Sequence, residues 1–232
     1  MNIEDKFNMT LEQNIFVAKR NIVDYIWKSA NLEGINVTFP ETQKIYEGGN
    51  VGNLRIDEIV AINNLKHGWQ FILSTITSSK DFNYLSSINA IVGSNLVDNA
   101  GRLRSGDVRI GGTKWKPELP NQNKFKEDIK EINQIENITE RAITQMCYIM
   151  RSQMFWDGNK RTAMLFANHE MVKNGKGIIT ISIDIKDLFG EKLTEYYETN
   201  NMENLKQFVY ENCIDGIDFS EKNDQKSEEE QV

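Results

Sequence analysis

The chain has 232 residues, of which 39% are hydrophobic and 26% are charged, a composition typical of a packed globular core rather than a disordered chain. Its formal net charge of −7 disfavours a general nucleic-acid binder, which usually carries a basic face. No apolar run approaches the roughly 18 residues that a membrane helix needs, and the N-terminus lacks the apolar stretch of a secretory signal. Two cysteines are too few for a disulfide framework. We therefore expect a cytoplasmic protein with two reduced, buried thiols and with neither a membrane nor a nucleic acid as partner.

The first hundred residues show helical periodicity. Thr10 and Gln13 fit a capping box, and the apolar residues after them recur at helical spacing as far as Gly34, a good C-cap residue. A glycine-containing loop follows, and the apolar residues from Ile62 to Ile76 then recur in steps of three and four. Further helices are expected over residues 82–97 and within 123–137.

Residues 101–120 interrupt this pattern. Glycines flank the alternating run from Asp107 to Ile110, and two prolines close the segment, which predicts a β-hairpin or an extended flap on a helical body. An ordinary surface hairpin would not explain the clustering of three arginines in an acidic chain: Arg102, Arg104 and Arg109.

A loop between two further predicted helices, 139–151 and 162–172, has the residues of a phosphate site. A helix N-terminus leaves backbone N–H groups unpaired and suits an anion, and Gly158 permits close approach of the backbone to a ligand. Asn159, Lys160 and Arg161 add donors, and Asp157 adds a carboxylate that can hold Mg²⁺. From these residues alone, a nucleotide-phosphate site and a plain helix–helix turn with a capping aspartate and solvated basic residues are about equally well supported.

Three segments together resemble the Fic (Fido) family. Residues 155–161, Phe-Trp-Asp-Gly-Asn-Lys-Arg, resemble its signature loop, His-x-Phe-x-Asp/Glu-Gly-Asn-Gly/Lys-Arg-x-x-Arg. Residues 101–112 are similar to the family's flap, which presents a target segment by strand addition. Residues 29–34, Ser-Ala-Asn-Leu-Glu-Gly, are similar to its autoinhibitory motif, Ser/Thr-x-x-x-Glu-Gly/Asn, in the subclass with an N-terminal inhibitory helix. The resemblance implies a mainly all-α fold, a Fic/Fido helical bundle with a short β-hairpin flap.

The resemblance also implies a domain organisation. Residues 1–52 would form an N-terminal helix with the inhibitory-type motif and a loop, residues 53–219 the Fic/Fido core, and residues 220–232 an acidic tail. Residues 221–232 hold five acids and two lysines, hence −3 of the net charge of −7, and one apolar residue. We expect a solvated tail, with an acidic docking segment as the less favoured alternative.

Family members typically transfer AMP from ATP to a hydroxyl of a target protein, and a Doc-like branch phosphorylates. The resemblance implies ATP or another nucleotide and Mg²⁺ as cofactors, a target with a Ser, Thr or Tyr hydroxyl as partner, and it leaves a homo-oligomer open. The implied site residues are Gln153 at the position of the family's catalytic His, with Phe155; Asp157 for the metal; Gly158, Asn159, Lys160 and Arg161 for the nucleotide; Ser29, Glu33 and Gly34 for inhibition; and Gly106, Asp107, Val108, Arg109 and Ile110 for target docking.

Three departures from the family pattern bear on activity. Gln153 cannot accept a proton at neutral pH, and losing a general base typically costs about 10²–10⁴ in rate. Met164 stands where the family's second Arg holds the terminal phosphate and pairs with the inhibitory Glu, and Lys160 replaces the commoner Gly, as in the Doc-like branch. The two histidines, His67 and His169, lie outside the motif, and we expect surface or packing roles for both.

Three functions are compatible with these residues. They are a Fic-type nucleotidyl- or phosphotransferase with a changed or slow mechanism, a nucleotide-binding pseudoenzyme that regulates or scaffolds a partner, and a helical interaction protein with a vestigial site. A metal carboxylate and a phosphate-binding Arg kept in one run disfavour the third. We therefore expect a Fic-type nucleotide-binding protein derived from a protein AMP-transferase, in which Gln153 decides between enzyme and pseudoenzyme.

Overall fold

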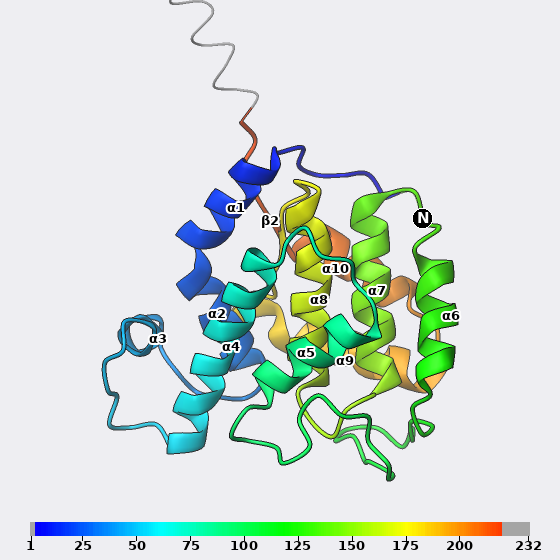
Figure 1. The fold of residues 1–232 in the computed structure, drawn as a ribbon, viewed down its shortest axis with the longest axis horizontal. Coiled ribbons are helices and arrows are strands. Elements are labelled where there is room, and N and C mark those ends of the chain that lie inside the picture. The colour runs from blue at the N-terminus through cyan, green and yellow to red at the C-terminus, as the bar shows by residue number, and fades with distance from the viewer. Residues whose placement is uncertain (1–2, 220–232) are drawn as a thin grey trace, which may run out of the picture.

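The protein is an α-helical bundle with one small sheet, seen in a computed structural model that describes residues 3–219 (Figure 1). The helices are α1 (Leu11–Arg20), α2 (Ile22–Leu32), α3 (Phe39–Tyr46), α4 (Ile56–Ser74), α5 (Phe82–Val92), α6 (Gln122–Ile132), α7 (Ile138–Ser152), α8 (Asn159–Lys173), α9 (Lys186–Thr199) and α10 (Glu203–Asn212). A 3₁₀ turn spans Ile183–Ile185, and β1 (Ile178–Ile179) pairs antiparallel with β2 (Ile214–Asp215). The mainly α-helical class is thus confirmed. No helix within residues 3–219 is long and apolar enough to cross a membrane.

Helix α8 forms the centre of the bundle. Twelve of its 15 residues are buried, and it packs against α1, α4, α5 and, most extensively, α7. Figure 1 shows α8 running between α7 and the α4–α5 pair, with its N-terminus at the end of the bundle where residues 101–120 lie. Cys147 on α7 and Cys213 lie buried in this core without a disulfide, as expected. The central packing fixes the position and direction of the α8 N-terminus, where the phosphate site is predicted.

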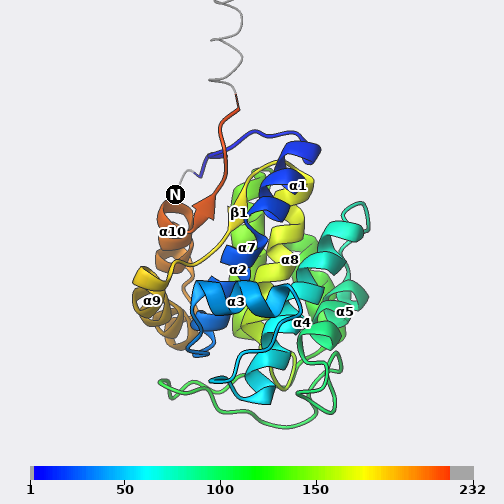
Figure 2. The same cartoon turned by 90° about the vertical axis from the view of Figure 1, so that its left-hand side faces the viewer.

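The single helix expected to end near Gly34 is two consecutive helices that meet at Asn21. The predicted capping box is confirmed, because Thr10 Oγ1 accepts from the Gln13 amide and Gln13 Oε1 accepts from the Thr10 amide. Gly34 has φ of +83° and follows the end of α2. Helix α2 packs against both α3 and α4, and α3 lies in front of it in Figure 2; α2 buries its apolar face in the common core. The residues of the inhibitory-type motif are therefore held firmly against the bundle.

The segment 101–120 is an extended flap and not the predicted β-hairpin. None of its residues pairs in a β-ladder, and the single sheet of the described residues joins β1 to β2 instead. Hydrogen bonds from the Arg104 side chain take the place of the cross-strand backbone bonds that a hairpin would have. Arg104 is buried, and its guanidinium donates to the carbonyls of Gly106 and Glu118, which ties the start of the flap to its end. The flap lies at one end of the bundle in both Figure 1 and Figure 2. The acidic tail predicted at 220–232 lies outside the described residues.

His169 on α8 is a packing histidine, as expected. Its ring is fully buried with an edge-on contact to Tyr84, and its Nε2 lies 3.1 Å from the carbonyl oxygen of Thr75. Burial, reinforced by the charges of Lys80 and Lys173, lowers the pKa of His169 from 6.5 to about 4. The folded protein therefore keeps this imidazole neutral over a pH range in which the unfolded chain protonates it.

We expect the free energy of unfolding to fall as the pH is lowered from about 6.5 to about 4, because only the unfolded chain takes up a proton at His169 in this range. A fall in pKa from 6.5 to about 4 corresponds to roughly 3 kcal/mol. Urea unfolding at the two ends of the range measures the loss. His169→Gln retains a donor for the Thr75 carbonyl but does not titrate, so its loss should be smaller by about this amount. Equal losses in both proteins would contradict the assignment.

Candidate phosphate site at the N-terminus of α8

The loop between α7 and α8 ends in a helix N-terminus that no side chain caps. The first backbone bond of α8 runs from the Thr162 N–H to the Gly158 carbonyl, so the three preceding N–H groups have no partner in the helix. Gly158 has φ of +74°, and a Cβ there would lie 2.8 Å from a methyl carbon of Val92. Glycine is therefore required at this position. The exposed N–H groups and the positive end of the helix dipole favour an anion.

Asn159 shapes the loop rather than pointing its amide outward. Its Oδ1 accepts from the Phe155 N–H at 3.0 Å, and its Nδ2 donates to the Phe155 carbonyl at 2.8 Å. Phe155 is itself buried, so its ring and its backbone both anchor the loop to the core. Of the residues predicted to bind nucleotide, Asn159 can contribute its backbone N–H, while its side chain holds the loop in shape.

Gln153 lies where α7 ends, and its side chain is engaged within the protein. Its backbone is left-handed, with φ of 44° and ψ of 53°, a strained conformation for a residue with a Cβ. Its Nε2 donates to the Met150 carbonyl at 2.7 Å and lies 3.4 Å from the Tyr197 hydroxyl. Its Oε1 accepts from Asn159 at 3.2 Å. The backbone therefore presents position 153 at the loop, but the amide is occupied by contacts that fix it.

Arg161 and Asp157 form an ion pair at the start of α8. One terminal nitrogen of Arg161 lies 3.0 Å from Asp157 Oδ2, and the Arg161 side chain is 7% exposed while that of Asp157 is 58% exposed. The Nε of Arg161 is buried without a hydrogen-bond partner among the described residues. A buried guanidinium with spare donors beside an exposed carboxylate can serve a phosphate and its metal ion.

Glu33 contacts the loop through Lys160. Its Oε2 lies 3.6 Å from Lys160 Nζ, and its Oε1 is buried without a partner among the described residues. Ser29, one turn earlier in α2, lines a small cavity together with Arg161 and Met164. The structure thus brings the inhibitory-type motif to the phosphate loop. It also gives Glu33 a lysine where the family pattern would provide the second arginine.

The flap lies over the loop. A Cβ on Gly106 would lie 2.9 Å from the Trp156 ring, so glycine allows the flap and the loop to touch. Asp107 and Arg109 are exposed, whereas Val108 and Ile110 are half-buried, the alternation expected for an extended segment on a core. No hydrogen bond within residues 3–219 involves the backbone of residues 107–110. This backbone is available for strand addition.

Two residues to which the sequence assigned no role hold the flap and the loop together. Arg104 donates from Nε to the Gln153 carbonyl at 2.6 Å, and its backbone N–H donates to Met154. Asn89 on α5 donates to the Asp157 carbonyl at 2.9 Å and accepts from the Gly101 N–H at 2.8 Å. Both contacts join residues far apart in the sequence, so no local pattern signals them. Only the three clustered arginines drew attention to position 104.

The donor set fits one Mg²⁺ shared with phosphate oxygens. No group of three or more His, Cys, Asp or Glu residues within the described chain could hold a metal by itself. Mg²⁺ in nucleotide sites is commonly bound by one or two carboxylates with the remaining ligands from phosphates and water. The exposed Asp157 carboxylate beside the α8 N-terminus meets that requirement.

Comparisons with known proteins identify the fold. Residues 80–171 match the sequence model of the Fic/DOC family, whereas no curated protein matches the sequence. Fic-1 from C. elegans superposes with a TM-score of 0.73 at 19% identity, covering 84% of this chain and 62% of that one. A Fic domain-containing signaling protein from Bacteroides thetaiotaomicron gives a TM-score of 0.71 at 17% identity, covering 87% and 84%. A Fic family protein from Desulfovibrio desulfuricans gives 0.66 at 16%, covering 86% and 65%. These likenesses establish the fold.

Proposed function

Because the chain contains a Fic/Fido domain, we propose that it binds a Mg²⁺–nucleotide at the N-terminus of α8 and derives from enzymes that transfer AMP from ATP to a protein hydroxyl. The observation that carries the proposal is the uncapped N-terminus of α8, at which Arg161, Lys160 and Asp157 gather. A plain helix–helix turn would not bury a guanidinium that lacks a partner for one of its donors.

Each part of the site has a distinct task in this chemistry. The free N–H groups of α8 and the guanidinium of Arg161 bind and orient the phosphates. Asp157 would hold Mg²⁺, which neutralises part of the phosphate charge when bound. The backbone of residues 107–110 aligns a target segment by strand addition. Such transfer depends mainly on positioning and electrostatics, so these residues support it without covalent chemistry of their own.

Gln153 separates two forms of the proposal. In the first, its amide orients the target hydroxyl, and transfer proceeds slowly without a protein base. In the second, a nucleotide-binding pseudoenzyme, the domain regulates or scaffolds a partner. The bonds from the Gln153 amide to Met150 and Asn159 favour the second form, because they occupy the groups that would orient a hydroxyl. Lys160 keeps a Doc-like phosphotransferase as a further alternative.

One experiment tests nucleotide binding and turnover together. The protein is titrated calorimetrically with ATP, CTP, GTP and UTP, each with and without Mg²⁺, and parallel samples with labelled nucleotide are examined for protein-bound label. We expect Mg²⁺-dependent binding of at least one nucleotide. Binding without label would support the pseudoenzyme, whereas label would support the transferase. No binding of any of the four nucleotides would refute the proposal.

We expect Glu33→Gln and Glu33→Gly to raise nucleotide affinity by roughly threefold to tenfold. Removing the carboxylate frees Lys160 for the phosphates and removes a negative charge near them, an effect of about 1 kcal/mol for a partly exposed pair. Calorimetry on the wild type and both variants measures the change. Glu33→Gln is the control for shape, because it keeps the side-chain size and removes only the charge. Affinities equal to that of the wild type would show that residues 29–34 only cap and pack a helix.

A further inference from the structure

A second polar cavity, of about 290 Å³, lies at the opposite end of α8 from the phosphate loop. It is lined by the turn after α4 (residues 78–80), by Arg141 in the first turn of α7, and by Glu170 and Lys173 in the last turns of α8. Glu170 lies eleven positions after Asn159 along the helix, about 16 Å at the usual helical rise. The cavity is therefore separate from the nucleotide site, and the function of that site does not account for it.

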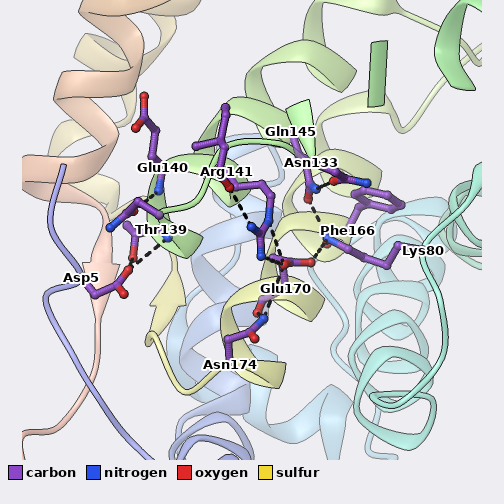
Figure 3. Close-up of polar contacts among 12 residues, drawn as sticks. Asp5, Lys80, Asn133, Thr139, Glu140, Arg141, Gln145, Phe166, Glu170 and Asn174 are labelled. Carbon is purple, nitrogen blue, oxygen red and sulfur yellow. Dashed lines mark hydrogen bonds and ion pairs between the residues drawn. The ribbon is translucent and has the colours of Figure 1, made fainter. Parts of the chain in front are cut away.

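The charges around this cavity do not balance. Glu170 is its only acidic lining residue, whereas Lys80, Arg141 and Lys173 are all cationic. Lys80 Nζ lies 2.9 Å from one Glu170 oxygen, and Arg141 Nη2 lies 2.7 Å from the other. Figure 3 shows Lys80 and Arg141 converging on Glu170 from opposite sides. Both oxygens of the one carboxylate are therefore already paired, and a net charge of about +2 remains in an otherwise acidic protein.

The two mostly buried cations, Lys80 and Arg141, are fixed in place by neutral partners. Lys80 also donates to Gln145 Oε1 at 2.6 Å, and Gln145 in turn donates to Asn133 at 2.8 Å (Figure 3). Arg141 donates to the Ile135 carbonyl at 2.7 Å. Because these bonds order both side chains before any ligand arrives, little side-chain entropy would be lost on binding.

Several donors around the cavity make no bond within residues 3–219. Arg141 has five N–H groups, and its hydrogen bonds to Glu170 and Ile135 use three of them, one each from Nε, Nη1 and Nη2. The exposed side chains of Lys173, Ser78 and Ser79 make no hydrogen bond or ion pair within residues 3–219. An ammonium, a guanidinium edge and two hydroxyls around one small space are the donors that phosphate-type oxyanions prefer.

Repulsion among the cations favours the same kind of ligand. Burial lowers the pKa of Lys80 from 10.5 to about 8, and the nearby charges of Arg141 and Lys173 act in the same direction, while Glu170 opposes them. A bound anion would stabilise the protonated lysine and reduce the repulsion among the three cations.

We propose that this cavity binds a phosphate-type oxyanion, either as free phosphate or as the phosphoryl group of a small phosphorylated molecule, through Lys173, Arg141 and the hydroxyls of Ser78 and Ser79. A volume of about 290 Å³ accommodates the phosphoryl group and part of the molecule that carries it. The proposal does not depend on nucleotide binding at the α8 N-terminus.

Amide NMR spectroscopy tests the proposal in the Arg161→Ala background, where the phosphate loop is weakened. Inorganic phosphate and AMP are titrated separately, each against chloride at equal ionic strength. We expect saturable shifts of the amides of residues 78–80 and 173 that chloride does not reproduce. Stronger binding of phosphate identifies the free ion as the ligand, and stronger binding of AMP identifies a phosphorylated molecule.

Two matched lysine variants complete the test. Lys173→Gln should weaken binding at residues 78–80 by roughly fivefold, since an exposed charge pair contributes up to about 1 kcal/mol. Lys19→Gln, which also removes an exposed lysine from the last turn of a helix, should leave binding unchanged. Both lysines are exposed, so neither variant endangers folding. Shifts confined to residues 157–161, shifts that chloride reproduces, or equal affinity in Lys173→Gln and the wild type would overturn the proposal.

Discussion

Gln153→His should raise protein-bound nucleotide label by about 10²–10⁴-fold over the wild type, the rate that a positioned general base typically contributes. Position 153 lies at the phosphate loop, because α7 ends there and Arg104 donates a hydrogen bond to the Gln153 carbonyl. Its left-handed backbone, with φ of 44°, is one that histidine adopts more readily than most residues. The substitution therefore adds a proton acceptor without requiring a new backbone conformation.

The pH dependence of Gln153→His distinguishes proton transfer to the new histidine from a mere loosening of the loop. An imidazole with an ordinary pKa near 6.5 becomes a competent base as the pH rises through that value, so label transfer should rise over the same range. Gln153→Ala is the control, since it also removes the amide bonds to Met150 and Asn159 but supplies no base. Mass spectrometry of nucleotide adducts measures all three proteins.

Each outcome of this experiment has a distinct meaning. Equal gains in the His and Ala variants would show that releasing the loop, and not proton transfer, limits the reaction. Adducts in the wild type that the histidine does not increase would show that Gln153 is not a gap in the mechanism. No adduct in any variant, with nucleotide still bound, would favour the pseudoenzyme. A gain of only about tenfold is still compatible with a base, because Met164 leaves the terminal phosphate without the second arginine.

Most helices could be predicted from the sequence because capping residues and apolar periodicity are local signals. The Thr10 and Gln13 capping box lies within one turn, and the apolar spacing of α4 reflects its own buried face. The break at Asn21 was not predicted, because the apolar spacing continues through it and one residue alone departs from helical dihedrals. Local patterns thus define helices well and define their interruptions poorly.

The arrangement of the site depends on contacts that no local pattern records. The expected hairpin in residues 101–120 is absent, because Arg104 bonds the two ends of the segment to each other and to α7. Asn89 joins α5 to both the flap and the loop across 12 and 68 residues of sequence. The side chain of Asn159 was expected at the phosphates and instead holds Phe155. The motif therefore indicated which residues meet, while the roles of individual side chains became clear only from the structure.

Arg161→Ala should weaken Mg²⁺–nucleotide binding by roughly tenfold to a hundredfold, since each charged hydrogen bond to phosphate contributes about 1.5–3 kcal/mol. Arg161 is buried, but its ion-pair partner Asp157 is largely exposed, so the variant leaves no charge buried and unpaired. Lys160→Ala is the matched control. Its side chain is more exposed and pairs with Glu33, and its loss should cost less than that of Arg161. Calorimetry at fixed Mg²⁺ measures the three affinities, and equal values for Arg161→Ala and the wild type would refute the phosphate site.

Asp157→Asn tests the contribution of the metal to nucleotide binding separately from that of the phosphate contacts at the same site. In the wild type, Asp157 would compete with bound phosphates for Arg161, because the two side chains are paired at 3.0 Å. A Mg²⁺ ion on the carboxylate would remove this competition, so Mg²⁺ should strengthen nucleotide binding to the wild type. In Asp157→Asn the guanidinium is already free, and the variant should bind nucleotide without Mg²⁺ at least as well as the wild type does. It should also gain little when Mg²⁺ is added. An equal gain from Mg²⁺ in both proteins would show that the metal is held elsewhere, and that the ion pair at the start of α8 is structural.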